Sequence, residues 1–232
     1  MVDGESIKGG VIVLPIDFGG PDARTFATPV WAQNPTPAQI AAAFPKEAIG
    51  VESGRVVLSC GVGPFGRLWP CQVATEAPQG RGFGAAAKQL ASDFQIAASA
   101  YDNVGGIKQV TLPITFYAPD ADRIDPITKP VWTRMIDPGK AQSLFPTKAA
   151  AAGLRAGKGV VDCIVDHLGH LTQCRPVAEE PADMGFGDAA VRVASVLAIN
   201  TWTPQGRPVD GAHIRLPMVL TLSPDAQASN AK

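Results

Sequence analysis

The chain has 232 residues, a formal net charge of −1 and no long charged run. Because a nucleic-acid partner demands a basic face, this balance argues against nucleic-acid binding. The longest apolar runs, such as Val11 to Ile16, are far too short to span a bilayer. The residues that follow Met1 do not have the pattern of a signal peptide. We therefore expect either that a secretion sequence has been removed or that the protein is cytosolic.

The first 43 residues are expected to hold an orphan strand and a Pro-rich linker. The strand, residues 10–18, has one apolar face, made of Ile12, Leu14, Ile16 and Phe18. Residues 13–18 match residues 111–116, so the chain opens on the last element of a repeat whose first part is missing. The linker contains Pro-Val-Trp, and we expect Trp31 to pin it onto a domain.

Short helices are expected at residues 37–44 and 138–144, each with proline in its first turn. One further helical turn is expected at 45–49 and at 146–152. These paired helices precede two long segments that are copies of each other, and such a repeat implies two folding units.

Each copy continues with a hairpin. Apolar residues alternate through Val56–Val62, which predicts a half-buried strand. The sequence Gly63-Pro64-Phe65-Gly66 that follows is typical of a turn. A turn centred between Phe65 and Gly66 sets Cys60 opposite Cys71. The second copy repeats the spacing, with Cys163 opposite Cys174 across a turn centred between Leu168 and Gly169. Cross-strand neighbours are close enough for a disulfide to form with modest adjustment.

A helix and a closing strand complete each unit. The helix faces are Phe83, Ala87, Leu90 and Phe94, and Phe186, Ala190, Val193 and Leu197. The closing strands are expected at Gly106–Phe116 and Ala212–Leu222. Their apolar faces are Val110, Leu112, Ile114 and Phe116, and Ile214, Leu216, Met218 and Leu220.

The predicted fold class is therefore α+β, with two tandem helix–strand–strand–helix–strand units. Each unit is a three-stranded antiparallel sheet with helices on one face. The predicted organisation is an orphan strand and linker at 1–43, a first domain at 44–117, a linker at 118–144, a second domain at 145–223 and a disordered tail at 224–232.

The four cysteines have three possible roles, as structural disulfides, as a redox dithiol or as a metal site. A single zinc site would need the two hairpins to converge, and neither pair has the short CxxC spacing of zinc knuckles and redox motifs. Structural disulfides are the favoured interpretation, and they imply an oxidising compartment.

Other candidate chemistry is sparse. The glycine-rich loop Gln79–Gly84 precedes a helix, but it follows a hairpin rather than the first strand of a βαβ unit, which favours a tight turn over a phosphate cradle. Glu76 and Glu179 are more plausible as acceptors for backbone N–H groups of the glycine turns than as a catalytic pair. His167 and His170 beside Asp166 form either a surface metal site or an exposed turn, and the exposed turn is favoured. We predict no enzyme activity, no cofactor and no metal.

The repeated pattern resembles the C-terminal domain of TonB family proteins. The matching motifs are Phe-Pro-x-x-Ala at 44–48 and 145–149, Gly-x-Val at 54–56, the turns Gly66-Arg67-Leu68 and Gly169-His170-Leu171, and Leu-Pro-Ile-x-Phe at 112–116. The cysteine pairs are similar to those of a divergent branch found in alphaproteobacterial envelope proteins. The resemblance covers residues 44–117 and 145–222.

This resemblance implies a periplasmic or envelope protein–protein interaction module. The TonB domain binds an extended segment of its partner by adding a strand to the sheet edge, and the two closing strands are the expected edges here. The chain departs from the TonB plan in having no anchor and no long Pro-Lys/Glu spacer, so the resemblance leaves open whether it takes part in energy transduction. The alternative is an assembly subunit whose edges are filled by neighbouring repeats, by strand 10–18, or by a second chain that pairs with strand 10–18.

Overall fold

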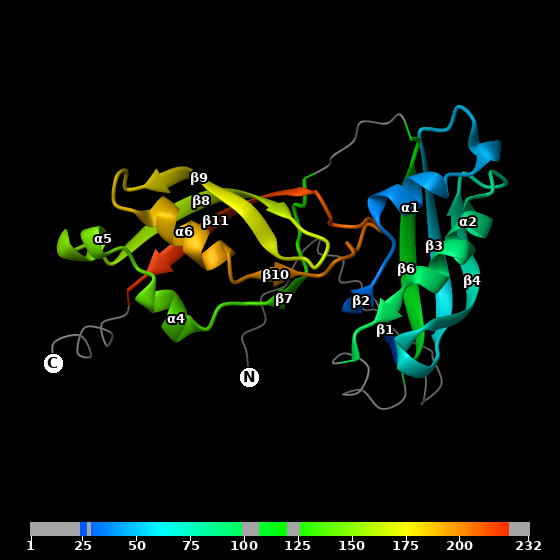
Figure 1. Cartoon of the computed structure of the whole chain (residues 1–232), viewed down its shortest axis with the longest axis horizontal. Helices are drawn as coiled ribbons and strands as arrows, with labels where there is room; N and C mark the ends of the chain where they lie inside the picture. The colour runs from blue at the N-terminus through cyan, green and yellow to red at the C-terminus, as the bar shows by residue number, and fades with distance from the viewer. Residues whose placement is uncertain (1–23, 27–28, 99–106, 120–125, 223–232) are drawn as a thin grey trace, which may run out of the picture.

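The computed structural model describes residues 24–26, 29–98, 107–119 and 126–222. Within these residues, two similar units each contain three antiparallel strands with a helix packed on one face (Figure 1). The sheet of the first unit has a fourth strand, which pairs in parallel and which the sequence did not predict. The predicted α+β class and the tandem arrangement are confirmed. The orphan strand at 10–18 and the tail at 224–232 lie outside the described residues.

The first unit is built on a hairpin, a helix and a closing strand. Its principal elements are β3 Ser53–Val62, β4 Leu68–Ala77, α2 Phe83–Leu90 and β6 Ile107–Tyr117. Before the hairpin lie α1 Pro37–Ala42 and a 3-10 turn at Lys46–Ala48. The unit also contains 3-10 turns at Pro64–Gly66 and Ala91–Asp93 and the short strand β5 Gln95–Ile96. The sheet order is β1-β6-β3-β4, where β1 is Arg24–Phe26.

The second unit repeats this plan closely. Its elements are α4 Pro138–Ser143, α5 Thr147–Ala151, β8 Ala156–Val165, β9 Leu171–Glu180, α6 Phe186–Ala194, β10 Ala198–Ile199 and β11 His213–Thr221. The sheet order is β11-β8-β9, so both closing strands lie beside the first strand of their hairpin.

The Gly-x-Val motif has a packing reason. A Cβ at Gly54 would lie 2.5 Å from the ring of Phe83, and a Cβ at Gly157 would overlap the ring of Phe186. Both rings are fully buried, so each phenylalanine lies flat on the bare backbone of the first strand. This close approach fixes α2 and α6 over their sheets and explains why glycine recurs there.

Both segments predicted as linkers contain short strands. Arg24–Phe26 forms β1, which pairs in parallel with β6, and Trp31–Gln33 forms β2, which pairs with β5. In the second segment, Trp132–Arg134 forms β7 and pairs with β10. Trp31 is buried and packs edge-on against Phe94 with ring centroids 4.9 Å apart, which confirms that it pins its segment onto the first unit.

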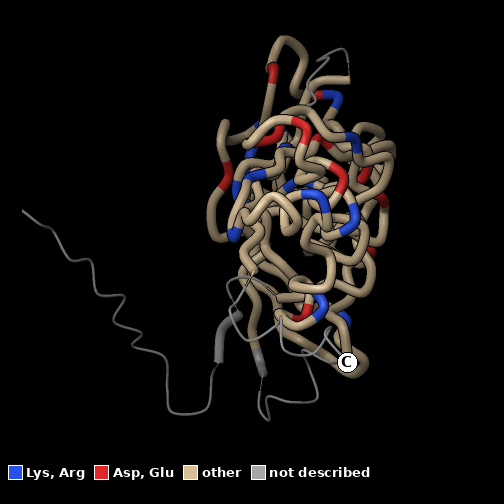
Figure 2. Tube along the Cα trace, turned by 90° about the vertical axis from the view of Figure 1, so that its left-hand side faces the viewer, with Lys and Arg blue, Asp and Glu red and all other residues tan. Residues whose placement is uncertain are grey.

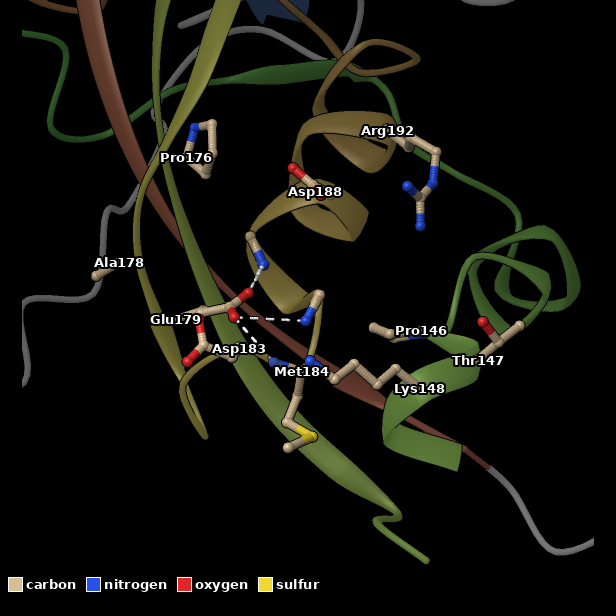
Figure 3. A pocket seen from close by; sticks show the side chains of 12 residues that line it. Pro146, Thr147, Lys148, Pro176, Ala178, Glu179, Asp183, Met184, Asp188 and Arg192 are labelled. Carbon is tan, nitrogen blue, oxygen red and sulfur yellow. Dashed lines mark hydrogen bonds between the residues drawn. The ribbon is translucent and has the colours of Figure 1, made fainter. Parts of the chain in front are cut away.

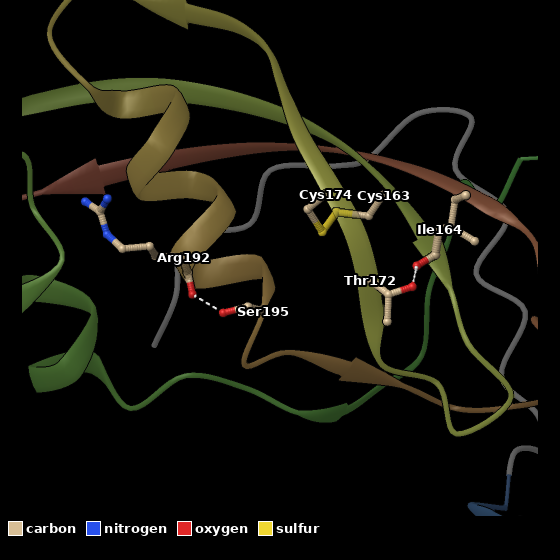
Figure 4. The surroundings of a disulfide bond; sticks show 6 residues. All are labelled: Cys163, Ile164, Thr172, Cys174, Arg192 and Ser195. Atoms are coloured by element: carbon tan, nitrogen blue, oxygen red, sulfur yellow. Dashed lines mark hydrogen bonds between the residues drawn. A yellow bond between two sulfur atoms is a disulfide. The ribbon is translucent and has the colours of Figure 1, made fainter.

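The cysteines form two disulfides. Cys60 bonds Cys71 and Cys163 bonds Cys174, as the turn positions predict. Figure 4 shows the second of these bonds. Cys60 and Cys163 are buried in the cores, and their partners pack against the same cores from partly exposed positions. No described helix is both long and apolar enough to cross a membrane.

Candidate functional site

The two closing strands differ in what lies beside their outer edges. Along a strand, the backbone N–H and C=O groups of alternate residues point to opposite sides. The N–H of Thr115 donates to Gly206 O, and the C=O of His213 accepts from the N–H of Ile127, so the odd-numbered residues of β6 and β11 face away from their sheets.

The sequence prediction named the even-numbered residues of these strands as binding residues. Their backbone groups point toward β3 and β8 instead. In β6 their side chains are fully buried beneath α2: Val110, Leu112, Ile114 and Phe116. In β11, Ile214 and Leu220 are buried, whereas Leu216 and Met218 are only half-buried. A partner could therefore reach the odd-numbered backbone groups of β11 and two of its predicted side chains.

The edge of β6 is covered, so the prediction that it is an open edge is wrong. β1 pairs with its first residues, from Ile107 to Val110. Residues 202–206 of the second unit cover the rest: Thr115 N–H donates to Gly206 O at 2.8 Å, and both Arg55 Nη1 and Thr115 Oγ1 donate to Gln205 O at 2.7 Å.

Trp202 anchors this contact. Its indole N–H donates to Pro113 O at 2.9 Å, and its ring packs edge-on against Phe94 with centroids 4.7 Å apart. Only 3% of Trp202 is exposed, and it belongs to the core of the first unit although it lies in the sequence of the second. The second unit therefore supplies a core residue to the first.

Asn200 makes a second link between the units. Its side chain is buried, accepts from Trp31 N–H at 3.3 Å and donates to Pro29 O at 2.8 Å. Because a buried amide costs free energy unless it is hydrogen-bonded, these contacts specify how the N-terminal segment lies on the second unit.

The edge of β11 is open over most of its length. Ile127 N–H donates to His213 O at one end. Beyond that point, within the part of the chain that the structure describes, no other segment forms backbone hydrogen bonds with the outward groups of Arg215, Val219 and Thr221. Val219 is 71% exposed. Pro217 has no N–H, which is typical of an edge strand.

A groove of about 400 Å³ runs beside this open edge, and we call it the edge groove. β11 forms one wall, α4 and the segment before it form another, and the end of α6 lies at the base. The apolar side chains that line it include Trp132, Ile136, Leu197, Leu216 and Met218. The edge groove therefore combines unpaired backbone groups with an apolar surface, which is the arrangement that an added strand or loop uses.

The edge groove is the counterpart of the position that Trp202 fills in the first unit. Trp132 of the groove corresponds to Trp31, and Leu197 corresponds to Phe94. Pro217 and Pro113 occupy the same position in the two closing strands, since they pair with Val160 and Val57 of equivalent strands. One pocket is thus filled by a neighbouring unit, and its equivalent has no occupant among the described residues.

A more polar pocket of about 610 Å³ lies at the start of α6 (Figure 3). At its base, Glu179 accepts hydrogen bonds from the N–H groups of Met184, Gly185 and Gly187, at 2.7–3.4 Å. The bond from Gly187, with help from the other two, lowers the pKa of Glu179 although its partial burial opposes the shift. This confirms the predicted bonding of Glu179 to the glycine turn, and the carboxylate is occupied by the fold.

Glu76 occupies the equivalent position in the first unit. One of its carboxylate oxygens, Oε1, is buried without a hydrogen-bond partner. Glu76 and Glu179 lie in different units, each beside its own glycine turn, so they do not form a catalytic pair. Gln79–Gly84 likewise forms a turn into α2, where Gly82 adopts a left-handed conformation with φ of 82°.

The histidine cluster forms a hydrogen-bonded turn. Asp166 Oδ1 accepts from the N–H groups of Leu168 and His170, and Oδ2 lies 3.3 Å from His170 Nδ1. Burial raises the pKa of Asp166, but the N–H groups of His170 and Leu168 outweigh it and the net shift is downward. Among the described residues, no group of three or more potential ligands has metal-binding geometry.

Charged residues of both signs are interspersed along the described chain (Figure 2). This mixture agrees with the net charge of −1. Sequence reasoning missed the roles of Asn200 and Trp202. The available signal was that Trp202 follows the matched face of the second helix, at a point where the first copy has small residues.

No protein-family model matches the chain. A protein of Caulobacter vibrioides, described as an uncharacterized protein, is 31% identical over 64 residues, which is 28% of this chain. The chain spans 64% of that relative's length.

Proposed function

We propose that this protein is a protein–protein interaction module of the bacterial periplasm or cell envelope, which binds a segment of a partner protein along the outer edge of β11. The single observation that supports this most strongly is the open edge beside an apolar groove. Arg215, Val219 and Thr221 present outward backbone groups, and the groove offers about 400 Å³ for side chains. Backbone bonds then supply affinity and the groove supplies selectivity.

The proposed location depends on the disulfides. Both cysteine pairs are bonded, and structural disulfides persist in oxidising compartments. The resemblance of the repeated motifs to the TonB C-terminal domain points to the same compartment and to the same mode of binding.

An assembly subunit is the second candidate function. The covered edge of β6 favours it, because residues 202–206 of one unit fill the edge of the other. In this alternative, the edge of β11 is filled by a further copy of the chain, and the complex grows by repeating the contact.

Selection from a random peptide library tests the leading proposal. Peptides selected on the oxidised protein are expected to lose at least tenfold in affinity when Val219→Pro removes an outward N–H. The substitution suits an exposed edge position because proline is tolerated there. Val177→Pro, at a bulge on the opposite edge strand β9, is the matched control and is expected to leave binding unchanged.

Two outcomes would overturn the proposal. One is that no peptide binds more tightly than about 1 mM, the weak end of measurable specific binding. The other is that Val177→Pro weakens binding as much as Val219→Pro does. Self-association of the purified chain, weakened by Val219→Pro, would instead favour the assembly subunit.

A further inference from the structure

In the first unit, the pocket equivalent to the edge groove is occupied by Trp202. The way Trp202 is held there indicates what kind of side chain the edge groove can bind. Residues 202–206 form a tight loop, closed by bonds from Gly206 N–H to Thr203 O and from Thr203 N–H to Arg207 O. This loop presents Trp202 to the pocket and the carbonyl groups of Gln205 and Gly206 to the strand edge.

From this comparison we infer that the edge groove binds a tryptophan side chain of a partner protein, carried on a short loop that ends in glycine four residues later. The inference rests on the proposed function and names the chemistry of its ligand. The indole ring would enter the groove, its N–H would donate to Pro217 O, and the glycine carbonyl would accept from Val219 N–H.

The equivalent groups support each of these contacts. Pro113 O accepts the indole N–H in the first unit, and Pro217 occupies the same position in β11. Thr115 N–H donates to Gly206 O. Val219 is the equivalent of Thr115 in β11. Thr115 pairs with Arg55 of β3, and Val219 pairs with Lys158 at the matching position of β8.

The floor of the groove is also suited to an indole. In the first unit, Trp202 packs on Phe94 beside Trp31. The edge groove keeps the aromatic neighbour as Trp132 and replaces Phe94 by the smaller Leu197. Ala141 of α4 takes the place of the buried Ile40 of α1, which widens the groove further.

The glycine requirement follows from the backbone approach. Gly206 has a φ of 85°, and a Cβ there would lie 2.7 Å from the carbonyl of Pro113. Any side chain would therefore push the loop off the strand. One contact is not reproduced, because Val219 has no hydroxyl to replace Thr115 Oγ1 on the carbonyl of the preceding residue.

The occupant is a separate protein rather than the loop of residues 202–206 from a second copy of this chain. Trp202 is already 97% buried within the first unit of the same molecule, because only 3% of it is exposed. Using that loop on a second copy would empty the first pocket and expose Phe94, so no net burial would result.

The test uses the full-length oxidised protein and the synthetic peptide Thr-Trp-Thr-Pro-Gln-Gly-Arg, the sequence of residues 201–207. Binding is followed by the amide chemical shift of Val219. We expect saturable binding that weakens at least tenfold when tryptophan is changed to alanine in the peptide, because buried tryptophans dominate interface energetics. Changing the peptide glycine to alanine is expected to weaken binding by a similar factor.

Protein variants locate the site. Ala141→Trp, which places an indole in the groove from α4, is expected to abolish binding. Lys88→Trp, on the exposed face of α2, is the matched control and is expected to leave binding unchanged.

The outcomes separate this inference from the proposed function. Equal binding of the tryptophan and alanine peptides, both still sensitive to Val219→Pro, would overturn the indole site and leave the edge function intact. Binding that survives Ala141→Trp would also overturn the indole site. A dimer of the wild-type chain in sedimentation, absent in Ala141→Trp, would overturn the assignment to a separate partner. No edge-dependent binding by selected peptides of any sequence would remove the proposed function as well.

Discussion

The outer edges of β6 and β11 are equivalent by register but have different neighbours. β6 receives β1 at one end and the loop of residues 202–206 at the other, so its outward backbone groups are covered where Thr115 and Pro113 lie. β11 is met only near His213, and its groove has no described occupant. An exposed strand edge is a template for pairing, and this difference is the basis for proposing that the second unit binds a partner at β11.

The largest expected effect comes from Trp202→Ala. This change removes a fully buried ring and its bond to Pro113 O, and it opens a cavity beside Phe94. We expect a loss of about 3–5 kcal/mol in the free energy of unfolding, the range measured for buried large-to-small aromatic substitutions. Urea denaturation followed by circular dichroism measures it.

Trp132→Ala is the matched variant in the edge groove. Trp132 is only partly buried and lines the open edge groove, so its loss is expected to cost clearly less. Equal losses for the two tryptophans would contradict the difference in packing between the filled pocket and the open edge groove.

The disulfides should behave alike in the two units. Each closes a loop with a sequence separation of 11, which is expected to stabilise its unit by about 3 kcal/mol. The double variants Cys60→Ser/Cys71→Ser and Cys163→Ser/Cys174→Ser are therefore expected to lose similar amounts in denaturant titrations. A loss confined to one pair would show that the units are not equally dependent on this bond.

Asn200→Ala is expected to lower the free energy of unfolding by less than Trp202→Ala or the loss of a disulfide does. It leaves Trp31 N–H and Pro29 O without their side-chain partner, at a cost of about 1–3 kcal/mol. Thermal unfolding measures the loss. Ala97 takes the position of Asn200 in the first copy, and Ala97→Ser, which disturbs no described side-chain bond, is the control.

The smallest expected effect is a pH dependence from Glu179. Its pKa is lowered in the folded protein by the N–H groups of the glycine turn, chiefly that of Gly187. The stabilisation is therefore fully present above the ordinary pKa of about 4.5 and is lost as the pH falls below it.

Glu179→Gln is expected to flatten this part of the stability profile between about pH 4.5 and the lowered folded-state pKa. The exposed neighbour Glu180, changed to Gln, serves as the control. An unchanged acid profile in Glu179→Gln would show that the turn does not hold the carboxylate as described.

Local patterns in the sequence predicted the units well. The turn centred between Phe65 and Gly66 set Cys60 opposite Cys71, and the spacing of Phe186, Ala190 and Val193 predicted a helix with one buried face. Such patterns suffice because strand and helix periodicities place residues relative to near neighbours.

The contacts between units could not be derived in the same way. The burial of Trp202 in the first unit depends on how two separately folded sheets lie against each other, and no local period encodes that. The same limit explains the covered edge of β6, because neither β1 nor residues 202–206 carry a pairing signal that is stronger than that of a loop.

The most direct test of the account is the amide hydrogen exchange of Thr115 and Val219 in the same sample. These N–H groups are equivalent in register, and among the described residues only that of Thr115 has a backbone hydrogen bond to another segment. The account predicts slow exchange at Thr115, fast exchange at Val219, and protection of Val219 when an edge-binding peptide is added. Equal protection of the two amides in the free protein would contradict it.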